Sequence, residues 1–194
     1  KKFTSGCPRS KGYLFTVGEG SKLIFDKVNL FDKFEMIKVM PGGVAEFTFD
    51  KTIQKNGNST SRSTWFNEGG IFSFPNGFTL HRTATSGWSK RASFRIQQKS
   101  GTMNLGGDVS LGNASGTESN AMGLYFQWFG GKVHALNNVN FNVDKTFQWI
   151  SSEIQKSFIE ENAIITAEVD SDKRMDVSVL ELREGVAITK EGEG

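Results

Sequence analysis

Residues 121–136 read AMGLYFQWFGGKVHAL, and apolar and polar side chains alternate on both sides of the pair Gly130-Gly131. Two alternating runs that flank a diglycine are typical of a β-hairpin closed by a two-residue turn. With Phe129 opposite Lys132, one face of this hairpin is apolar and carries Met122, Leu124, Phe126, Trp128, Val133 and Ala135. Because successive side chains of a strand point to opposite sides, the other face carries Tyr125, Gln127, Lys132 and His134. The sequence therefore predicts a central hairpin with one packed side and one polar side.

The length and composition are those of an ordinary folded domain. A chain of 194 residues, 37% hydrophobic and 23% charged, is long enough to bury one core. It has 17 Phe but 2 Tyr, and 22 Gly but 3 Pro, which favours many short strands joined by turns. We expect an irregular leader over residues 1–12, one β-sandwich domain over residues 13–189, and a frayed tail over residues 190–194.

Alternating apolar residues predict strands in several further stretches, among them residues 44–49, 92–97 and 139–143. One helix is expected over residues 146–161, where Phe147, Ile150, Ile154 and Phe158 recur at spacings of three and four. No repeat of fixed period is evident. Many short strands with at most one helix predict an all-β fold, a two-sheet antiparallel β-sandwich of the jelly-roll or concanavalin-like kind.

The charge pattern argues against two classes of partner. The net charge of +2 comes from 23 basic and 21 acidic residues spread along the chain, so there is no strong field to attract nucleic acid. No stretch approaches twenty apolar residues, so membrane insertion is not expected. The chain starts at Lys1 without a methionine, which suggests a mature or excised product whose targeting segment is missing from view. We expect an extracellular, secreted protein. The triplets Asn58-Ser59-Thr60 and Asn113-Ala114-Ser115 match the N-glycosylation pattern and permit that location.

The sequence lacks the motifs of several enzyme and metal sites. It contains no G-x-S-x-G elbow, no Walker loop, no H-E-x-x-H and no dinucleotide fingerprint after a strand. His81 and His134 are the only histidines and Cys7 is the only cysteine, so neither a multi-histidine metal centre nor an internal disulfide is expected. We expect no cofactor. A structural calcium ion held by loop carboxylates such as Glu118, Asp170 and Asp172 stays open beside the simpler reading, a solvated turn.

The polar face of the hairpin is the candidate binding surface. Amides and cations bond sugar hydroxyls or carboxylates, and flat side chains stack on sugar rings, so a surface of this kind suits a carbohydrate polymer. Arg95 and Gln97 extend the surface if their strand lies beside the hairpin, and Trp65 and Trp88 are expected at its rim. The sequence thus predicts a module that binds a polysaccharide or a surface glycan with Arg95, Gln97, Tyr125, Gln127, Lys132, His134, Trp65 and Trp88.

Three other readings stay open. As a lyase for an acidic polysaccharide, the protein would use His134 to remove the C5 proton and Tyr125 to protonate the leaving oxygen, an analogy of residue types alone. Arg95 with Gln97 or Gln127 would then neutralise the uronate carboxylate. As a structural or receptor-binding subunit of a virion, fibre or filament, it would use exposed Phe or Trp in subunit contacts, and the Gly/Asn/Ser-rich residues 102–113 fit that use. The last reading is an ordinary solvated sheet face with no function.

Overall fold

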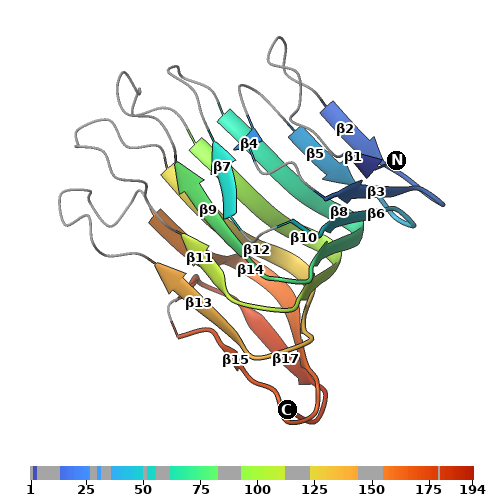
Figure 1. Cartoon of the computed structure of the whole chain (residues 1–194). Helices are drawn as coiled ribbons and strands as arrows, with labels where there is room; N and C mark the ends of the chain where they lie inside the picture. The colour runs from blue at the N-terminus through green and yellow to red at the C-terminus, as the bar shows by residue number, and fades with distance from the viewer. Residues whose placement is uncertain are drawn as a thin grey trace.

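The computed structural model describes residues 2–3, 14–26, 30–31, 36–49, 52–55, 62–82, 93–111, 123–143, 155–178 and 180–194. These residues form seventeen strands and no helix. The strands make two sheets, one of eleven strands and one of six (Figure 1). Every strand pair in both sheets is parallel. The predicted antiparallel sandwich is therefore wrong, although the all-β part of that prediction agrees with the described residues.

The strands differ in length according to whether they turn a corner. Four long strands bend in the middle: β8 (Arg62–Phe74), β10 (Ser93–Leu105), β12 (Gly123–Ala135) and β14 (Gln155–Val169). The short strands of the same sheet are β1 (Lys2–Phe3), β2 (Leu14–Val17), β3 (Lys22–Phe25), β5 (Met36–Val39), β6 (Val44–Phe47), β16 (Glu181–Leu182) and β17 (Ala187–Glu191). The smaller sheet contains β4 (Leu30–Phe31), β7 (Thr52–Lys55), β9 (Phe78–Arg82), β11 (Val109–Leu111), β13 (Val139–Val143) and β15 (Met175–Asp176).

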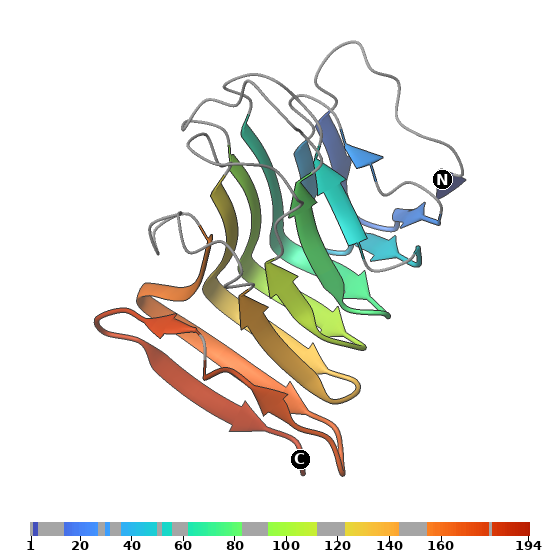
Figure 2. The same cartoon turned by 60° about the vertical axis from the view of Figure 1, so that its left-hand side comes forward.

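The chain winds as a solenoid, in which each coil pairs in register with the coils before and after it. Phe74 pairs with Leu105 and Leu105 pairs with Ala135, steps of 31 and 30 residues. The smaller sheet advances in the same way, from Leu80 to Leu111, a step of 31. Figures 1 and 2 show the coils stacked in sequence order, from blue at the N-terminal end to red at the C-terminal end. A structural repeat therefore exists, but its steps are unequal, so the sequence shows no repeat of fixed period.

Each coil passes through three walls. Wall 1 contains β2, β5, the first halves of β8, β10, β12 and β14, and β16. Wall 2 contains β1, β3, β6, the second halves of the same long strands, and β17. Wall 3 is the six-stranded sheet. The boundary between walls 1 and 2 is visible at β8, because its first half pairs with β5 and its second half pairs with the separate strand β6.

The central hairpin and the helix expected from the sequence are both replaced by strands. Residues 123–135 form the single strand β12, so Gly130-Gly131 is a corner between walls 1 and 2 and reverses no chain direction. The expected helix at 146–161 is contradicted over residues 155–161, which belong to β14. Its remaining residues, 146–154, lie outside the described residues.

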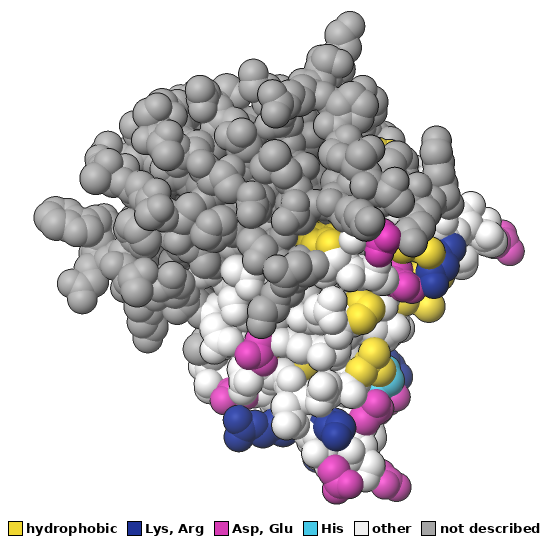
Figure 3. All heavy atoms as spheres, in the orientation of Figure 1, with side chains coloured by type: hydrophobic (Ala, Val, Ile, Leu, Met, Phe, Trp, Pro, Cys, Tyr) yellow, Lys and Arg dark blue, Asp and Glu magenta, His cyan; other side chains and the backbone are white. Residues whose placement is uncertain are grey.

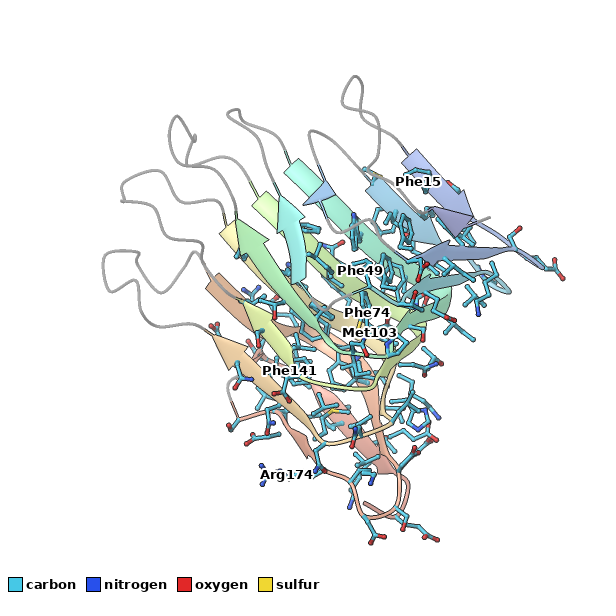
Figure 4. All side chains as sticks on the ribbon, viewed as in Figure 1. Phe15, Phe49, Phe74, Met103, Phe141 and Arg174 are labelled. Atoms are coloured by element: carbon cyan, nitrogen blue, oxygen red, sulfur yellow. The ribbon has the colours of Figure 1, made fainter. Side chains whose placement is uncertain are left out.

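The interior is filled by aromatic side chains that repeat from coil to coil. Phe25, Phe47 and Phe74 lie one above another on wall 2, with ring centroids 4.8 and 4.7 Å apart and nearly parallel planes. Trp65 of wall 1 stacks on Phe47 at 5.0 Å. Figure 4 shows Phe49, Phe74, Met103 and Phe141 between the walls, and all four are buried. Because inward positions alternate with outward ones in all three walls, burial of one face of each strand builds the whole core.

Both ends of the described chain pair with a neighbouring coil. Lys2 and Phe3 form β1, which pairs with β3. At the other end β17 extends to Glu191, and the backbone N–H of Gly194 donates to the carbonyl oxygen of Val169 at 3.4 Å. Within the described part of the chain there is no helix of the length and hydropathy needed to cross a membrane.

Candidate functional site

The outward side of wall 1 is a lattice of side chains drawn from neighbouring parallel strands. Because the strands pair in register, outward residues of β5, β8, β10 and β12 form rows across the wall. Strands are about 4.8 Å apart, and outward side chains repeat about every 6.6 Å along each strand. The two complete rows are Met36, Thr64, Arg95 and Tyr125, and next to them Lys38, Phe66, Gln97 and Gln127.

Each of these rows contains a contact between β10 and β12. The guanidinium carbon of Arg95 lies 5.0 Å from the centroid of the Tyr125 ring, a cation–π distance. In the next row Gln97 Nε2 donates to Gln127 Oε1 at 2.7 Å. Gln127 is buried, at 7% exposure, whereas Arg95, Gln97 and Tyr125 are partly exposed. These contacts order a cation, an aromatic ring and two amides on one surface.

Phe66 lies in the same lattice beneath two lysines that a glutamate joins. Lys38 Nζ and Lys99 Nζ are 5.5 and 4.6 Å from the centroid of the Phe66 ring. The Glu68 carboxylate contacts Lys38 at 2.5 Å and Lys99 at 2.9 Å. Hydrogen bonds from Lys38 and then from Lys99 lower the pKa of the Glu68 carboxyl below its ordinary value. The three charged side chains therefore form a bridge across β5, β8 and β10.

Amides under the corner hold wall 1 in place. Asn67 and Gln98 are fully buried and occupy equivalent positions in successive coils. Asn67 Nδ2 donates to the Gly70 and Thr102 carbonyls at 3.0 and 2.9 Å, and Asn67 Oδ1 accepts from the Gly70 N–H at 2.9 Å. Gln98 Nε2 donates to the Ser100 and Gly101 carbonyls at 3.0 and 2.9 Å. Buried backbone groups at the corner thus find partners that a bent strand cannot supply by itself.

Wall 2 carries a separate charged cluster on its outer side. Lys132 Nζ lies 2.8 Å from Glu168 and 2.6 Å from Glu191, and His134 Nε2 lies 2.7 Å from Asp170. Hydrogen bonds to Glu168 and Glu191 raise the pKa of Lys132, and the bond from Lys132 lowers the pKa of Glu168. Figure 3 shows acidic and basic side chains gathered over the C-terminal coils.

The predicted site residues that the structure describes fall into three groups. Arg95, Gln97, Tyr125 and Gln127 lie together on wall 1, so the adjacency that the sequence left open is present. Lys132 and His134 lie beyond the corner on wall 2, which divides the predicted polar face in two. Trp65 is 0% exposed and packs in the core, so its expected place at the rim is wrong. Trp88, Cys7, Glu118 and both glycosylation triplets lie outside the described residues.

The two residues of the lyase hypothesis do not share a surface. Tyr125 and His134 are nine residues apart on β12, with the corner between them. At about 3.3 Å per residue that is too far for both to reach one glycosidic bond. Among the described residues no group of three or more His, Cys, Asp or Glu side chains is arranged to hold a metal ion. Asp170 of the calcium hypothesis instead contacts His134.

Sequence reasoning missed Phe66, Lys38 and Lys99, and it missed the bridge that Glu68 makes between the two lysines. These residues occupy outward positions that repeat from coil to coil. The repeat can be recognised in the sequence only when the coils are aligned at their corner residues. The corner residues with positive φ supply that alignment: Gly20, Gly42, Gly69, Gly101, Gly131, Asn162 and Gly185. With Gly69 and Gly101 superposed, Phe66 falls near Gln97 and Glu68 near Lys99, as the register confirms to within one residue.

The fold defines the class of the protein as a three-walled parallel β-solenoid, and wall 1 carries cation–π pairs on its outer side. Comparison of the chain with protein-family models, with curated proteins and with solved structures gives no match.

Proposed function

We propose that the protein binds a linear polysaccharide across wall 1. The supporting observation is the in-register lattice of Arg95, Gln97, Tyr125 and Gln127 on neighbouring strands. Tyr125 offers a ring face and a hydroxyl, Arg95 offers a fork of donors, and Gln97 offers an amide that the buried Gln127 orients. This combination suits sugar rings that carry hydroxyls around an apolar face.

The spacing of the wall supports a polymer that runs across the strands. A sugar ring is comparable in length to the separation of neighbouring strands, about 4.8 Å. A chain of sugars laid along a row therefore meets a new side chain at each strand, without a change in the backbone. Partly exposed polar side chains such as Arg95 and Gln97 can keep water-mediated contacts, which is compatible with specific binding to a polar polymer.

Affinity electrophoresis or calorimetry against a panel of soluble polysaccharides tests this proposal. Gln97→Ala and Tyr125→Ala should weaken binding several-fold, because each removes a contact on wall 1. The matched control is Asn104→Ala, which deletes an amide from the same strand β10 on the wall 2 side of the corner. Failure of every polysaccharide to bind, or equal loss in the control, would contradict the proposal.

A structural role is favoured by a different observation. Leu182 and Ile188 of the last two strands are 61% and 51% exposed. Exposed apolar groups beside a strand edge suit stacking on a second copy, as in a filament. Light scattering over a range of concentrations separates this role from the first, because a filament subunit grows in mass and a glycan-binding monomer does not.

A further inference from the structure

The part of wall 1 formed by β5, β8 and β10 carries an excess of positive charge. Its described outward cations are Lys38, Arg95 and Lys99, and its described outward anion is Glu68. On wall 2, acidic side chains outnumber basic ones around Lys132, because Glu168, Glu191 and Asp170 lie close by. A polymer that carries acid groups is therefore attracted to this part of wall 1 and repelled from the carboxylates of wall 2.

The bridge over Phe66 shows where an acid group would fit. Glu68 places one carboxylate oxygen on Lys38 and the other on Lys99, between β5 and β10. Those two strands are separated by β8, so their backbones are about 9.6 Å apart. The three side chains are 28–39% exposed, so water and solutes reach them. Ion pairs at this exposure contribute little to stability, and another carboxylate can replace Glu68 at small cost.

Exchange of the carboxylate would also change which groups lie over the Phe66 ring. The two ammonium groups that Glu68 holds are those within 5.5 and 4.6 Å of the Phe66 ring. An acid group brought by a ligand would take over the two lysines and would carry its own sugar ring to the position above Phe66. Arg95 lies in the adjacent row and would pair with the next acid group.

We infer that the ligand of wall 1 is an acidic polysaccharide, whose carboxylate takes the place of Glu68 between Lys38 and Lys99. This inference rests on the proposed function, since it names the chemical class of that ligand. Glu68 is then an internal competitor, which keeps the two lysines positioned over Phe66 until a polymer arrives.

The test compares uronate polymers with their carboxyl-reduced counterparts, which keep the sugar backbone and lose the charge. We expect binding to the acid form only, and affinity that falls as salt is added. Glu68→Gln should bind the acid form about two- to fivefold more tightly, because the competing carboxylate is gone. Lys99→Gln should bind it more weakly.

The matched control is Glu168→Gln, which removes a carboxylate from a lysine on wall 2 and should leave affinity unchanged. Thermal melts of all three variants establish that the fold is intact. Equal binding of the acid and reduced polymers overturns this inference and leaves the proposed function standing. Weaker binding by Glu68→Gln also overturns it, since Glu68 would then support the site. No binding of either polymer contradicts both proposals.

Discussion

One residue in each coil adopts a left-handed backbone conformation at the corner between walls 1 and 2. Six of these seven residues are glycine, and the seventh is Asn162, with φ of 54°. Gly131 shows why glycine is preferred, because a Cβ there would lie 2.6 Å from the carbonyl oxygen of Gly101 in the preceding coil. A side chain at this position is opposed both by the positive φ and by the backbone of the neighbouring coil.

Gly131→Ala should therefore lower the free energy of unfolding by about 2–4 kcal/mol. The control is Gly18→Ala, where an added Cβ meets no atom within 4 Å and φ is not positive. The control should change stability by less than about 0.5 kcal/mol. Urea denaturation followed by circular dichroism measures both, and equal stability of the two variants would refute the role given to the corner.

The buried amide of Asn67 gives a second prediction at the same scale. Its Nδ2 faces three oxygens, those of Gly70, Gln98 and Thr102, at 3.0, 3.2 and 2.9 Å. Asn67→Asp would place a carboxylate against them and should cost about 3–5 kcal/mol at pH 7. The pKa of the new carboxyl would be raised, so the lost stability should return as pH falls. Asn104→Asp, the same change on the outer side of β10, should show neither effect in the same denaturation series.

At the scale of the strand, stacked aromatic rings carry the packing from coil to coil. Phe47 contacts Phe25, Phe74 and Trp65 at centroid distances of 4.8, 4.7 and 5.0 Å. Parallel pairing in register makes such stacks unavoidable, because the same inward position recurs directly above itself. A phenylalanine-rich chain with few tyrosines suits this interior, since Phe has no hydroxyl to satisfy.

Phe47→Ala should destabilise the protein by about 3–5 kcal/mol, because it opens a cavity in the stack. Phe129→Ala is the matched control, since Phe129 is 36% exposed and should cost less than about 1 kcal/mol. Thermal melts recorded side by side distinguish them. A melting temperature that is unchanged in Phe47→Ala would show that the stack does not hold the coils together.

Ion pairs between strands make stability depend on pH in a defined direction. The folded-state pKa values of Glu68 and Glu168 are lowered from 4.5 by hydrogen bonds from lysines. A lowered carboxyl pKa contributes stability above the unfolded-state value, and that contribution is lost as pH falls through the folded-state value. The melting temperature should therefore decline below about pH 4.5, and less steeply in the Glu68→Gln, Glu168→Gln double variant. Identical declines in the two proteins would assign the effect to other groups.

At the scale of the whole molecule, the local sequence pattern predicts which side chains are buried but does not predict the topology. The alternation in residues 121–136 correctly indicates that Leu124, Phe126, Trp128, Val133 and Ala135 are buried. The same alternation does not distinguish a hairpin from a corner, because both use a glycine with positive φ and both change which residues face inward. Parallel pairing is set by residues about 30 positions away, and the unequal steps between corner glycines conceal that repeat. The sequence could suggest that Arg95 lies beside Tyr125. It could not show that His134 lies on a different wall, because that follows from the corner at Gly130-Gly131.

In a solenoid, unlike in a β-sandwich, deletion of one whole coil should leave a protein that still folds. Leu105 and Ala135 are register partners in adjacent coils, so residues 106–135 amount to one full turn. Their removal brings Leu136 directly after Leu105 and lets each later strand occupy the place of its neighbour, because coils contact only the coils beside them. The shortened protein should retain a strand-rich circular dichroism spectrum and a cooperative melt at a lower temperature. Deletion of residues 106–120 removes half a turn and places β12 against the wrong wall, so that variant should fail to fold. If both deletions behave alike, the coil is not the unit from which this molecule is built.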